Sequence, residues 1–507
     1  MPGLRVKGRA AFTAATLWCV LASGCSVAAP GPGAGPGRAA YPREQRIPLA
    51  VIDTLELRAH TYFLAHDALA GRATGTPGGE LAAIYIAAQC RRLGLQPAAG
   101  DYFQEVPLVE ITFAGGTLRV RDSVSAREFV LSEDFVPDFM TGRSLDGLRG
   151  PAVYLNTPID LEVLPPLEGA IAVTLGPVGG PSALSALEMR GAAAVIQAGV
   201  DRSSFTLYRS SRGETLLRHA DDGIESSLLS RIPVFVAGAE VTAALLAGTP
   251  LALGRPMPDG PLGKYVELEL RTAHKAVSAR NVACLLPGRE PELRDTAIAY
   301  TAHYDHLGYG PPDERGDSVY NGFSDNAAGV AMLLAIAKAM KEGPAPRHSF
   351  LFLFFTGEER GLLGSDYYVA RPVWPLERTR AVINLDAGAP PGRPASWRLA
   401  GGEGNELGLL AVDVALEMGW SATTSAARPN SDYFPFHREG VPAIAVIPGP
   451  GPFQGLTTDS SNALRRRWDF YHRPGDEWSE EFPFAGLQRY ASYAYLIGAA
   501  LDRRDRP

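Results

Sequence analysis

The chain has 507 residues, which is enough for two or three domains. Hydrophobic residues make up 46% and charged residues 20%, the balance of a globular protein, so bulk disorder is excluded. The 48 basic and 55 acidic side chains give a formal net charge of −7, which argues against a nucleic-acid partner because such proteins usually carry a basic face.

Residues 1–24 have the features of a secretory signal peptide. Basic side chains precede an apolar run over residues 10–22, which is too short to span a bilayer and ends in small residues. The sequence LASGC that follows is similar to a bacterial lipoprotein cleavage box, with Cys25 as the lipidated residue; an ordinary signal peptide cleaved nearby is the alternative. Residues 25–48 are rich in proline and glycine, which favours an extended linker. We therefore expect a folded body held at a membrane of the cell envelope by a lipid anchor.

The first folded segment, residues 49–133, begins with helical periodicity and ends with strand-like alternation. Apolar residues recur at helical spacing from Leu55 to Leu64 and again after Pro77, and the second helix is expected to stop at Leu93-Gly94. The stretches TLRVRD and REFVL then alternate as strands do.

The middle segment, residues 134–264, has a pattern of its own. The strand-like runs AIAVTL, AAAVIQA and IPVFVA alternate with the helix-like runs SALSALEMRG and EVTAALLAG. We expect a small α/β unit with its own apolar core and few catalytic groups. Its only histidine, His219, falls in a polar stretch beside Arg218, and we interpret it as solvated and without a function.

Cys90 and Cys284 are the cysteines that remain beyond the predicted signal peptide and lipidation site. Cys90 ends an apolar helical run, and Cys284 lies in the strand-like stretch NVACLL. Buried free thiols are the interpretation we favour, because cysteine packs as a small apolar side chain. A disulfide in an oxidising compartment is the alternative, and the sequence alone does not place it.

The third segment, residues 265–507, contains the strongest strand patterns of the chain. The runs DTAIAYTA, SFLFLFFTG and AVINL are almost continuously apolar, as central strands buried on both faces are. Each run leads into acidic or imidazole side chains: His303, Asp305 and His306, then Glu358 and Glu359, then Asp386. Open α/β sheets bind ligands beyond the carboxyl ends of their strands, so we expect one site at this edge.

Carboxylates that cluster at one sheet edge need cations. A buried carboxylate without a partner costs on the order of several kcal/mol or takes up a proton, and the neighbouring segments supply no matching set of lysines or arginines. Metal ions are therefore the expected partners. Asp325, before an apolar helix, and His472, in a loop, are further ligand candidates. Taken alone, Asp325 is also typical of a helix cap, and a loop histidine is more often a surface residue than a ligand.

Taken in order, HYDHLG, NGFSDNAAG, TGEERGLLGS, NLD, SDYFPF and YHRPGDE resemble the motifs of the secreted dizinc aminopeptidase family. The resemblance covers most of Leu57 to Leu501 and includes the upstream ALAGRATGTPGG. It implies an α/β fold of the zinc-peptidase type, with a mixed central sheet flanked by helices built from residues 49–133 and 265–507. Residues 134–264 resemble the small α/β protease-associated domain that is often inserted in this family.

The resemblance implies two Zn²⁺ ions held by five side chains: His303, Asp325, Glu359, Asp386 and His472. One ion would bind His303 and Asp386, the other would bind Glu359 and His472, and Asp325 would bridge them. A mixed set of oxygen and imidazole ligands suits zinc.

The resemblance also implies the residues that act beside the ions. Glu358 would be the general base, and Tyr471 would stabilise the developing oxyanion. Asp305 would orient His303, since ligating histidines usually need such a partner. His306 is expected to support a ligand or the fold.

The expected function is release of N-terminal residues from peptides by a water that two zinc ions activate. The alternatives are a carboxypeptidase, a glutaminyl cyclase and a non-catalytic binding homologue. The intact pair Glu358-Glu359 disfavours the cyclase, and the complete ligand set disfavours the binding homologue. A carboxypeptidase needs a cationic pocket for the terminal carboxylate, which the sequence does not reveal. The expected partners are peptide substrates and, through the anchor, a membrane.

Overall fold

The computed structural model describes residues 52–138, 147–160, 162–179, 181–202, 205–206, 215–221, 223–228 and 231–504. The predicted signal peptide, Cys25 and the predicted linker to residue 48 lie outside these ranges. They stay predictions.

The helices of the described residues are α1 (Thr54–Leu64), α2 (Pro77–Arg92), α3 (Pro181–Met189), α5 (Ala239–Leu246), α6 (Ala328–Glu342), α7 (Leu363–Ala370), α8 (Glu406–Glu417), α9 (Tyr433–Arg438), α10 (Thr458–Arg467) and α11 (Ala485–Arg503). Short helical turns are η2 (Asp67–Arg72), η3 (Pro250–Leu253), η4 (Phe323–Ala327) and η5 (Leu376–Arg378).

The strands of the same residues are β1 (Gln96–Pro97), β2 (Phe103–Arg121), β3 (Ala126–Val130), β4 (Phe135–Pro137), β5 (Leu148–Leu155), β6 (Ile171–Leu175), β7 (Ala194–Ala198), β8 (Thr215–His219), β9 (Val234–Ala237), β10 (Gly260–Leu286), β11 (Ala297–His303), β12 (Gly308–Tyr309), β13 (Val319–Tyr320), β14 (Ser349–Phe355), β15 (Thr379–Asn384), β16 (Ser396–Ala400), β17 (Ser421–Ser425) and β18 (Ala443–Pro448).

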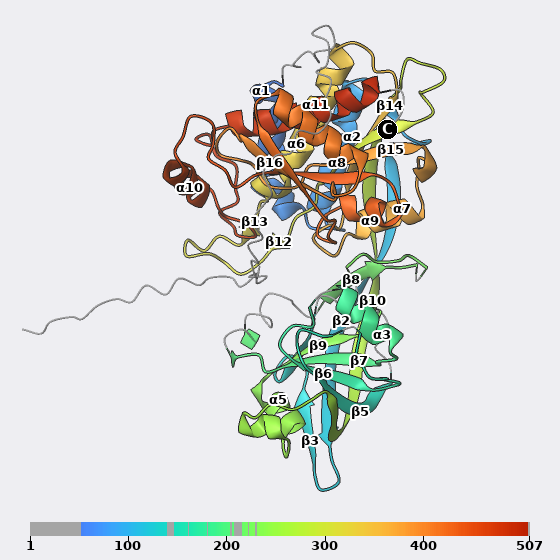
Figure 1. Ribbon diagram of the computed structural model, residues 1–507, viewed down its shortest axis with the longest axis vertical. Helices are drawn as coiled ribbons and strands as arrows, with labels where there is room; N and C mark the ends of the chain where they lie inside the picture. Colours follow the sequence, from blue (N-terminus) through green and yellow to red (C-terminus); the bar gives the residue numbers. More distant parts are fainter. Residues whose placement is uncertain are drawn as a thin grey trace, which may run out of the picture. The chain divides into compact units, whose positions relative to one another are not determined.

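The central sheet is mixed, as predicted. Strands β17, β16, β18, β15, β11, β14 and β10 follow one another in this order. Figure 1 labels β16, β15, β14 and β10 among them. The neighbours β14, β11, β15 and β18 are parallel, whereas β10 and β16 run antiparallel to β14 and β18. The apolar runs of the third segment therefore form adjacent parallel strands whose carboxyl ends share one edge.

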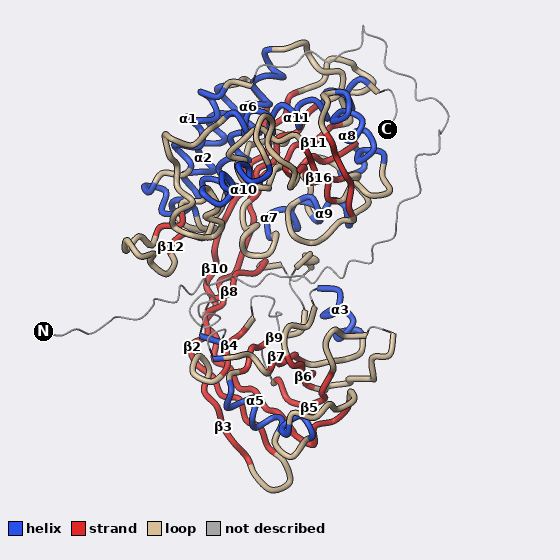
Figure 2. The backbone as a smooth tube through the Cα atoms, turned by 60° about the vertical axis from the view of Figure 1, so that its left-hand side comes forward, coloured by secondary structure: helices blue, strands red, loops and turns tan. Residues whose placement is uncertain are grey.

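Alternating residues of each central strand bury its two faces against different helices. Ile298 and Tyr300 of β11 point into a core shared with α1, α2, α6, α8 and α11. Ala297 and Ala299 point to the other face, which packs on α7 and α9. Figure 2 shows α1, α2 and α6 grouped beside the strands. Burial on both faces explains why these strands are almost continuously apolar.

Helix α2 illustrates how local sequence sets an element. Thr76 Oγ1 accepts a hydrogen bond from the Gly79 N–H, and Pro77 occupies the first turn, so the helix begins at Pro77 and includes the Pro77-Gly78-Gly79 stretch that the sequence placed before its start. Its buried face repeats at helical spacing and includes Ile86 and Cys90. Helix α6, which continues η4, is long and apolar enough to cross a membrane, but 83% of its most apolar window is buried inside the protein, as in the core helix of a globular domain.

The middle segment forms a second core. Strands β5, β6, β7 and β9 are parallel neighbours, and α3 and α5 have the positions predicted from the sequence. The buried residues of this core run from Ile111 to Leu268, so strands β2, β3 and β10 contribute to it from outside residues 134–264. Strand β10 passes the predicted boundary at residue 264 without a break. The domain boundaries stay predictions.

Two expectations from the sequence are wrong. His219 is 3% exposed rather than solvated: it ends β8, and its Nε2 lies 2.7 Å from the Leu363 carbonyl oxygen. Cys90 and Cys284 form a disulfide rather than two free thiols. Because α2 packs across β10, the Cα atoms of the two cysteines lie 6.3 Å apart, within reach of such a bond.

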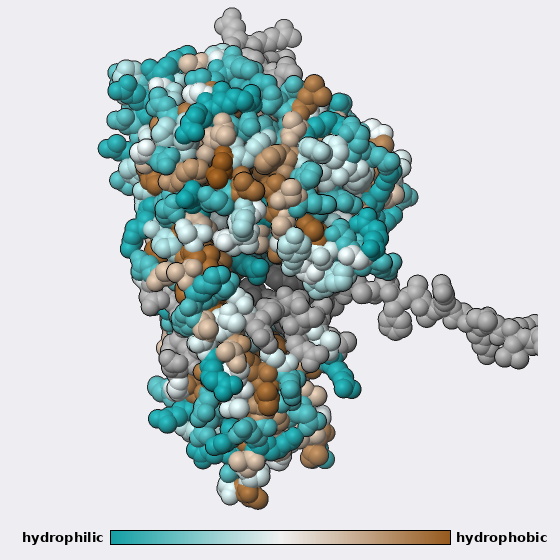
Figure 3. Space-filling model, turned by 180° about the vertical axis from the view of Figure 1, so that it is seen from behind, coloured by the Kyte–Doolittle hydropathy of each residue, from teal (hydrophilic) through white to brown (hydrophobic). Residues whose placement is uncertain are grey.

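The surface is mixed in character. On the face in Figure 3, hydrophobic residues occur in small groups among hydrophilic ones. This pattern is ordinary for a globular protein and marks no single docking surface on that face.

Candidate metal centre

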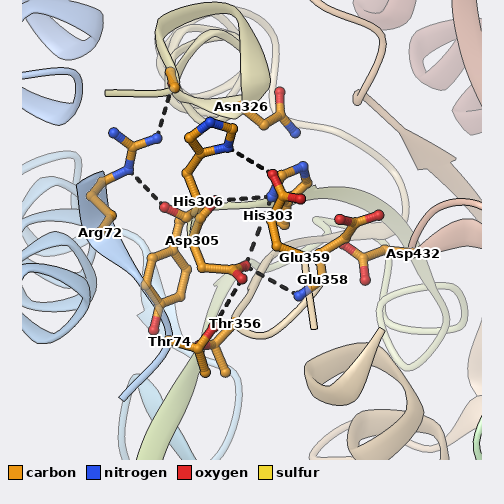
Figure 4. A network of polar contacts seen from close by, with 12 residues as sticks. Arg72, Thr74, His303, Asp305, His306, Asn326, Thr356, Glu358, Glu359 and Asp432 are labelled. Carbon is orange, nitrogen blue, oxygen red and sulfur yellow. Dashed lines mark hydrogen bonds and ion pairs between the residues drawn. The ribbon is translucent and has the colours of Figure 1, made fainter. Parts of the chain in front are cut away.

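The carboxyl ends of three parallel strands bring the predicted chemistry together. His303 is the last residue of β11, Glu358 and Glu359 follow β14, and Asp386 follows β15. Because β11 lies between β14 and β15, these residues converge at one edge of the sheet; Figure 4 shows His303, Glu358 and Glu359 together there. The residues predicted from the strand patterns therefore lie close together.

Asp325 and His472 reach this edge from two loops. Asp325 lies in η4, ahead of α6, and its N–H donates to Asp476 Oδ2 at 3.1 Å. The bond between Asp325 and Asn326 is a cis peptide. His472 lies in the loop after α10 with a φ of 54°, a left-handed conformation that non-glycine residues rarely adopt. Asp476 also accepts from the Ser324 N–H, a role that sequence reasoning missed.

One group of donors surrounds His303. Its Nε2 lies 3.1 Å from Asp386 Oδ1 and 3.2 Å from Asp325 Oδ1. These three side chains offer ligand atoms within 4.8 Å of one another and are buried or half-buried.

A second group of donors surrounds His472. Its Nε2 lies 3.1 Å from Asp325 Oδ2 and 3.2 Å from Glu359 Oε2. The two oxygens of Asp325 thus face different imidazoles, with a further carboxylate beside each.

The donor chemistry fits metal ions better than hydrogen bonds. An imidazole Nε2 carries at most one proton, so His303 cannot donate to Asp325 and Asp386 at full strength together. The edges of a tetrahedron around zinc are about 3.3 Å when its bonds are about 2.0 Å. The observed nitrogen–oxygen distances of 3.1 and 3.2 Å are close to that spacing. Both groups of donors therefore suit a zinc ion.

The outer carboxylates each have one oxygen held by the protein. Asp386 Oδ2 accepts from Ser431 Oγ at 2.5 Å, while its Oδ1 faces His303. Glu359 Oε1 lies 2.7 Å from His306 Nδ1, while its Oε2 faces His472. Ligating carboxylates are usually fixed in this way by a partner behind them. Sequence reasoning missed Ser431 and left the role of His306 open.

Asp305 is linked to the site by a different geometry from the one expected. His303 Nδ1 lies 3.1 Å from the backbone oxygen of Asp305 and 3.8 Å from its carboxylate. The carboxylate instead accepts from the Glu358 N–H at 3.2 Å and from Thr74 Oγ1 at 2.9 Å. Asp305 therefore contacts His303 through its backbone and the Glu358 segment through its side chain.

Glu358 has the environment of a base. Desolvation raises the pKa of its carboxyl group well above the ordinary value, His303 opposes this shift, and Asp386, Glu359 and Asp432 add to it. Figure 4 shows Asp432 beyond Glu358. Asp432 is fully buried, accepts from Ser365 Oγ at 2.5 Å, and was not singled out from the sequence.

Tyr471 lies at the edge of the site. It is 66% exposed, and its ring stacks on that of His472 with 3.8 Å between the centroids. A phenol at this position is open to solvent and adjacent to a candidate ligand.

Comparisons with known proteins find similarity to aminopeptidases. Residues 281–496 match the family model described as Peptidase family M28. A stretch of 167 residues is 29% identical to aminopeptidase YwaD of Bacillus subtilis (strain 168), covering 31% of this chain and 33% of that protein, so this chain spans about a third of that relative's length. A match of 424 residues, 24% identical, covers 78% of this chain and 72% of probable lipoprotein aminopeptidase LpqL of Mycobacterium tuberculosis.

A solved structure shares the fold. The aminopeptidase from Aneurinibacillus sp. strain AM-1 superposes with a TM-score of 0.53, covering 90% of this chain and 95% of its own, at 18% identity. At this identity the likeness supports the architecture alone. The residues matched by the family model include β11, β14 and β15, whose ends carry the site.

Proposed function

We propose that this chain, whose residues 281–496 match the model of Peptidase family M28, is a metallo-aminopeptidase that releases N-terminal residues from peptides with two bound zinc ions. The position of Asp325 is the observation that supports two ions rather than one. Its two oxygens face His303 and His472 separately, and a second carboxylate lies beside each imidazole. A single ion would leave one of these groups without a cation.

The five side chains predicted from the sequence would hold the ions: His303, Asp325, Glu359, Asp386 and His472. Zinc would supply Lewis acidity, which polarises the scissile carbonyl and lowers the pKa of water. The raised pKa of Glu358 suits it to take a proton from the attacking water and return it to the leaving amine. Tyr471 would donate its hydroxyl to the developing oxyanion.

The charge around the site favours an N-terminal substrate. Glu358, Glu359, Asp325 and Asp386 are gathered at one edge, and Asp432 lies behind Glu358. Two Zn²⁺ ions carry four positive charges against these five carboxyl groups, so no positive charge is left over for a terminal carboxylate, whereas an ammonium group finds hydrogen-bond acceptors at this acidic rim. We therefore expect free-amine substrates with apolar first residues.

An assay with matched substrates tests the direction of cleavage. The zinc-loaded enzyme should hydrolyse leucyl anilide, and N-acetylation of the same compound should remove nearly all turnover because the acidic rim loses its charged partner. Efficient release of the C-terminal residue from an N-acetylated peptide would instead assign a carboxypeptidase. Cyclisation of N-terminal glutamine without hydrolysis would assign a cyclase.

We also propose the cell-envelope context. The disulfide between Cys90 and Cys284 supports an oxidising compartment, and the match to a probable lipoprotein aminopeptidase supports lipid attachment at Cys25. The second core, with its parallel β5, β6, β7 and β9, would be the inserted protease-associated domain.

A further inference from the structure

A segment outside the matched region touches the site from the N-terminal side. Residues 70–74, here called the strap, follow the first turn of η2. Ala70, Gly71 and Arg72 all have left-handed φ values, of 48°, 69° and 51°. Consecutive left-handed residues are unfavourable unless the surrounding structure fixes them, and such strain collects near functional sites.

Close packing fixes the strap between two strands. A Cβ atom on Gly71 would lie 2.5 Å from the backbone oxygens of Gly308 in β12 and Tyr320 in β13. Only glycine fits there without displacing the backbone. The strap is thereby pressed against the segments that follow His303 and precede Asp325.

Arg72 anchors the strap with a side chain that is 1% exposed. Its Nε donates to the Tyr304 carbonyl at 2.8 Å, its Nη2 to the Gly322 carbonyl at 2.9 Å, and its Nη1 to the Asn321 carbonyl at 2.5 Å. Nη1 also donates to the carbonyl of Leu64 at the end of α1. One guanidinium therefore joins the residue after His303 to the residues just before Asp325 (Figure 4).

Burying this cation needs compensation, which the site supplies. Desolvation lowers the pKa of Arg72 to about 10, and the carboxylates of Asp476, Asp305, Asp325 and Glu359 oppose that shift. Arg72 therefore brings, from a distant part of the sequence, a positive charge that the segments carrying these acidic residues do not supply. Because its side-chain hydrogen bonds go to backbone oxygens, Arg72 leaves the ligand carboxylates free for metal.

Thr74 extends the same connection to the base. Its hydroxyl donates to Asp305 Oδ2, and Asp305 Oδ1 accepts from the Glu358 N–H. The His306 N–H, in turn, lies 3.3 Å from the Arg72 carbonyl oxygen, and His306 Nδ1 holds Glu359. The strap thus reaches each of the loops that carry His303, Asp325 and Glu358-Glu359.

We propose that Arg72 and Thr74 are positioning residues of the metal centre, which set the spacing of the ligand loops and thereby its affinity for zinc. This inference rests on the proposed two-zinc function. The strap lies outside residues 281–496, so the metal centre depends on a part of the chain that the family match does not include.

Zinc affinity, measured by competition with a chelator, tests the proposal. Thr74→Val keeps the shape of the side chain and removes its hydroxyl. Because Thr74 acts on the ligand loops through Asp305, its zinc dissociation constant should rise roughly 10-fold, the lower end of the effect of losing a direct partner behind a ligand. Thr74→Ser keeps the hydroxyl and should bind zinc as the wild type does. Arg72→Lys keeps the charge but cannot reach the Tyr304 and Gly322 carbonyls together, so it should also weaken binding.

Tyr102→Phe is the matched control for a loss of stability alone. The Tyr102 hydroxyl donates to the buried Leu95 carbonyl at 2.6 Å. Leu95 precedes β1, which pairs with the carboxyl end of β10. That end of β10 lies beside the start of β14, whereas the ligands follow the ends of the parallel strands, at the other edge of the sheet. This variant should lower the free energy of unfolding and leave the zinc dissociation constant unchanged.

Hydrogen exchange of the metal-free protein gives a readout independent of zinc. Peptides that cover residues 303–308 and 320–327 should exchange faster in Thr74→Val than in Tyr102→Phe. If both Thr74→Val and Arg72→Lys bind zinc and exchange hydrogen as the wild type does, the strap proposal is overturned. The two-zinc function would remain intact. Failure of the wild type itself to bind zinc would overturn both.

Discussion

At the scale of single residues, Glu358 combines a constrained backbone with a basic carboxyl group. Its N–H is held by Asp305, and its side chain faces His303 among several carboxylates. Desolvation raises the pKa of that carboxyl group, the direction that favours taking up a proton. Glu359, the next residue, is held by His306 and His472 instead. Neighbouring glutamates thus have different environments, which fit a base and a ligand.

Glu358→Gln should separate these roles. Glutamine keeps the shape of the side chain but cannot accept the proton, so kcat should fall by roughly 10²–10⁴ while zinc content stays at the wild-type level. Metal analysis and steady-state kinetics on the same preparation measure both. Loss of zinc, or near-normal turnover, would show that Glu358 is not the base.

The sequence could predict the ligands better than the residues behind them. His303, Glu359 and Asp386 stand directly after apolar strands, so chain position alone points to their common edge. Ser431 and Arg72 contact the same site from segments far away in sequence. Both lie in stretches that resemble the family, ALAGRATGTPGG and SDYFPF, but those letters do not say which atoms the two side chains contact, so only the fold reveals their partners.

At the scale of elements, helix α7 connects the site to the middle segment. Asp366 of α7 accepts from Ser227 Oγ at 2.6 Å and from the Ser227 N–H at 2.8 Å, and Arg438 of α9 donates to the same carboxylate at 3.2 Å. His219 contacts the backbone of Leu363 at the start of α7. Helix α7 follows the Glu358-Glu359 segment, so these contacts support the part of the chain that carries the base.

The junction at Asp366 predicts a pH dependence of stability. Burial raises the pKa of Asp366 from 3.8 to about 6, so the folded protein binds this proton more tightly than the unfolded chain. Its contribution to stability is present below about pH 4 and is lost as the pH rises to about 6, which amounts to roughly 3 kcal/mol. Asp366→Asn does not titrate, so between pH 4 and 7 the wild type should lose about this free energy of unfolding relative to the variant.

Urea unfolding of both proteins in the presence of a chelator measures the difference without a contribution from metal binding. The chelator is the control because zinc ligands also take up protons over this range. Parallel stability curves for the two proteins would contradict the assigned environment of Asp366.

Element positions followed from periodicity, whereas pairings between elements did not. The pattern after Pro77 predicted α2, and the apolar runs predicted β11 and β14. The interpretations of His219 and of Cys90 with Cys284 failed because each depends on which element lies opposite. A histidine in a polar stretch becomes buried when β8 packs against α7, and a helix cysteine finds a partner only when α2 crosses β10.

At the scale of the whole molecule, we expect the N-terminal region to decide where the enzyme acts. The predicted lipidation site lies before the described residues, and α1 begins at Thr54, so a tether of about thirty residues would join the anchor to the fold. Cys25→Ser should abolish incorporation of a labelled fatty acid and release the enzyme from the membrane fraction, with activity on soluble substrates unchanged. A wild-type protein that starts at another residue and carries no lipid would contradict the predicted anchor.

An anomalous-difference map of zinc-loaded crystals, recorded at the zinc absorption edge, tests the metal centre most directly. We predict two peaks about 3.5–4 Å apart. One should lie beside His303 and Asp386 and the other beside Glu359 and His472, with Asp325 between them. A single peak, or zinc bound away from Asp325, would contradict the two-zinc centre.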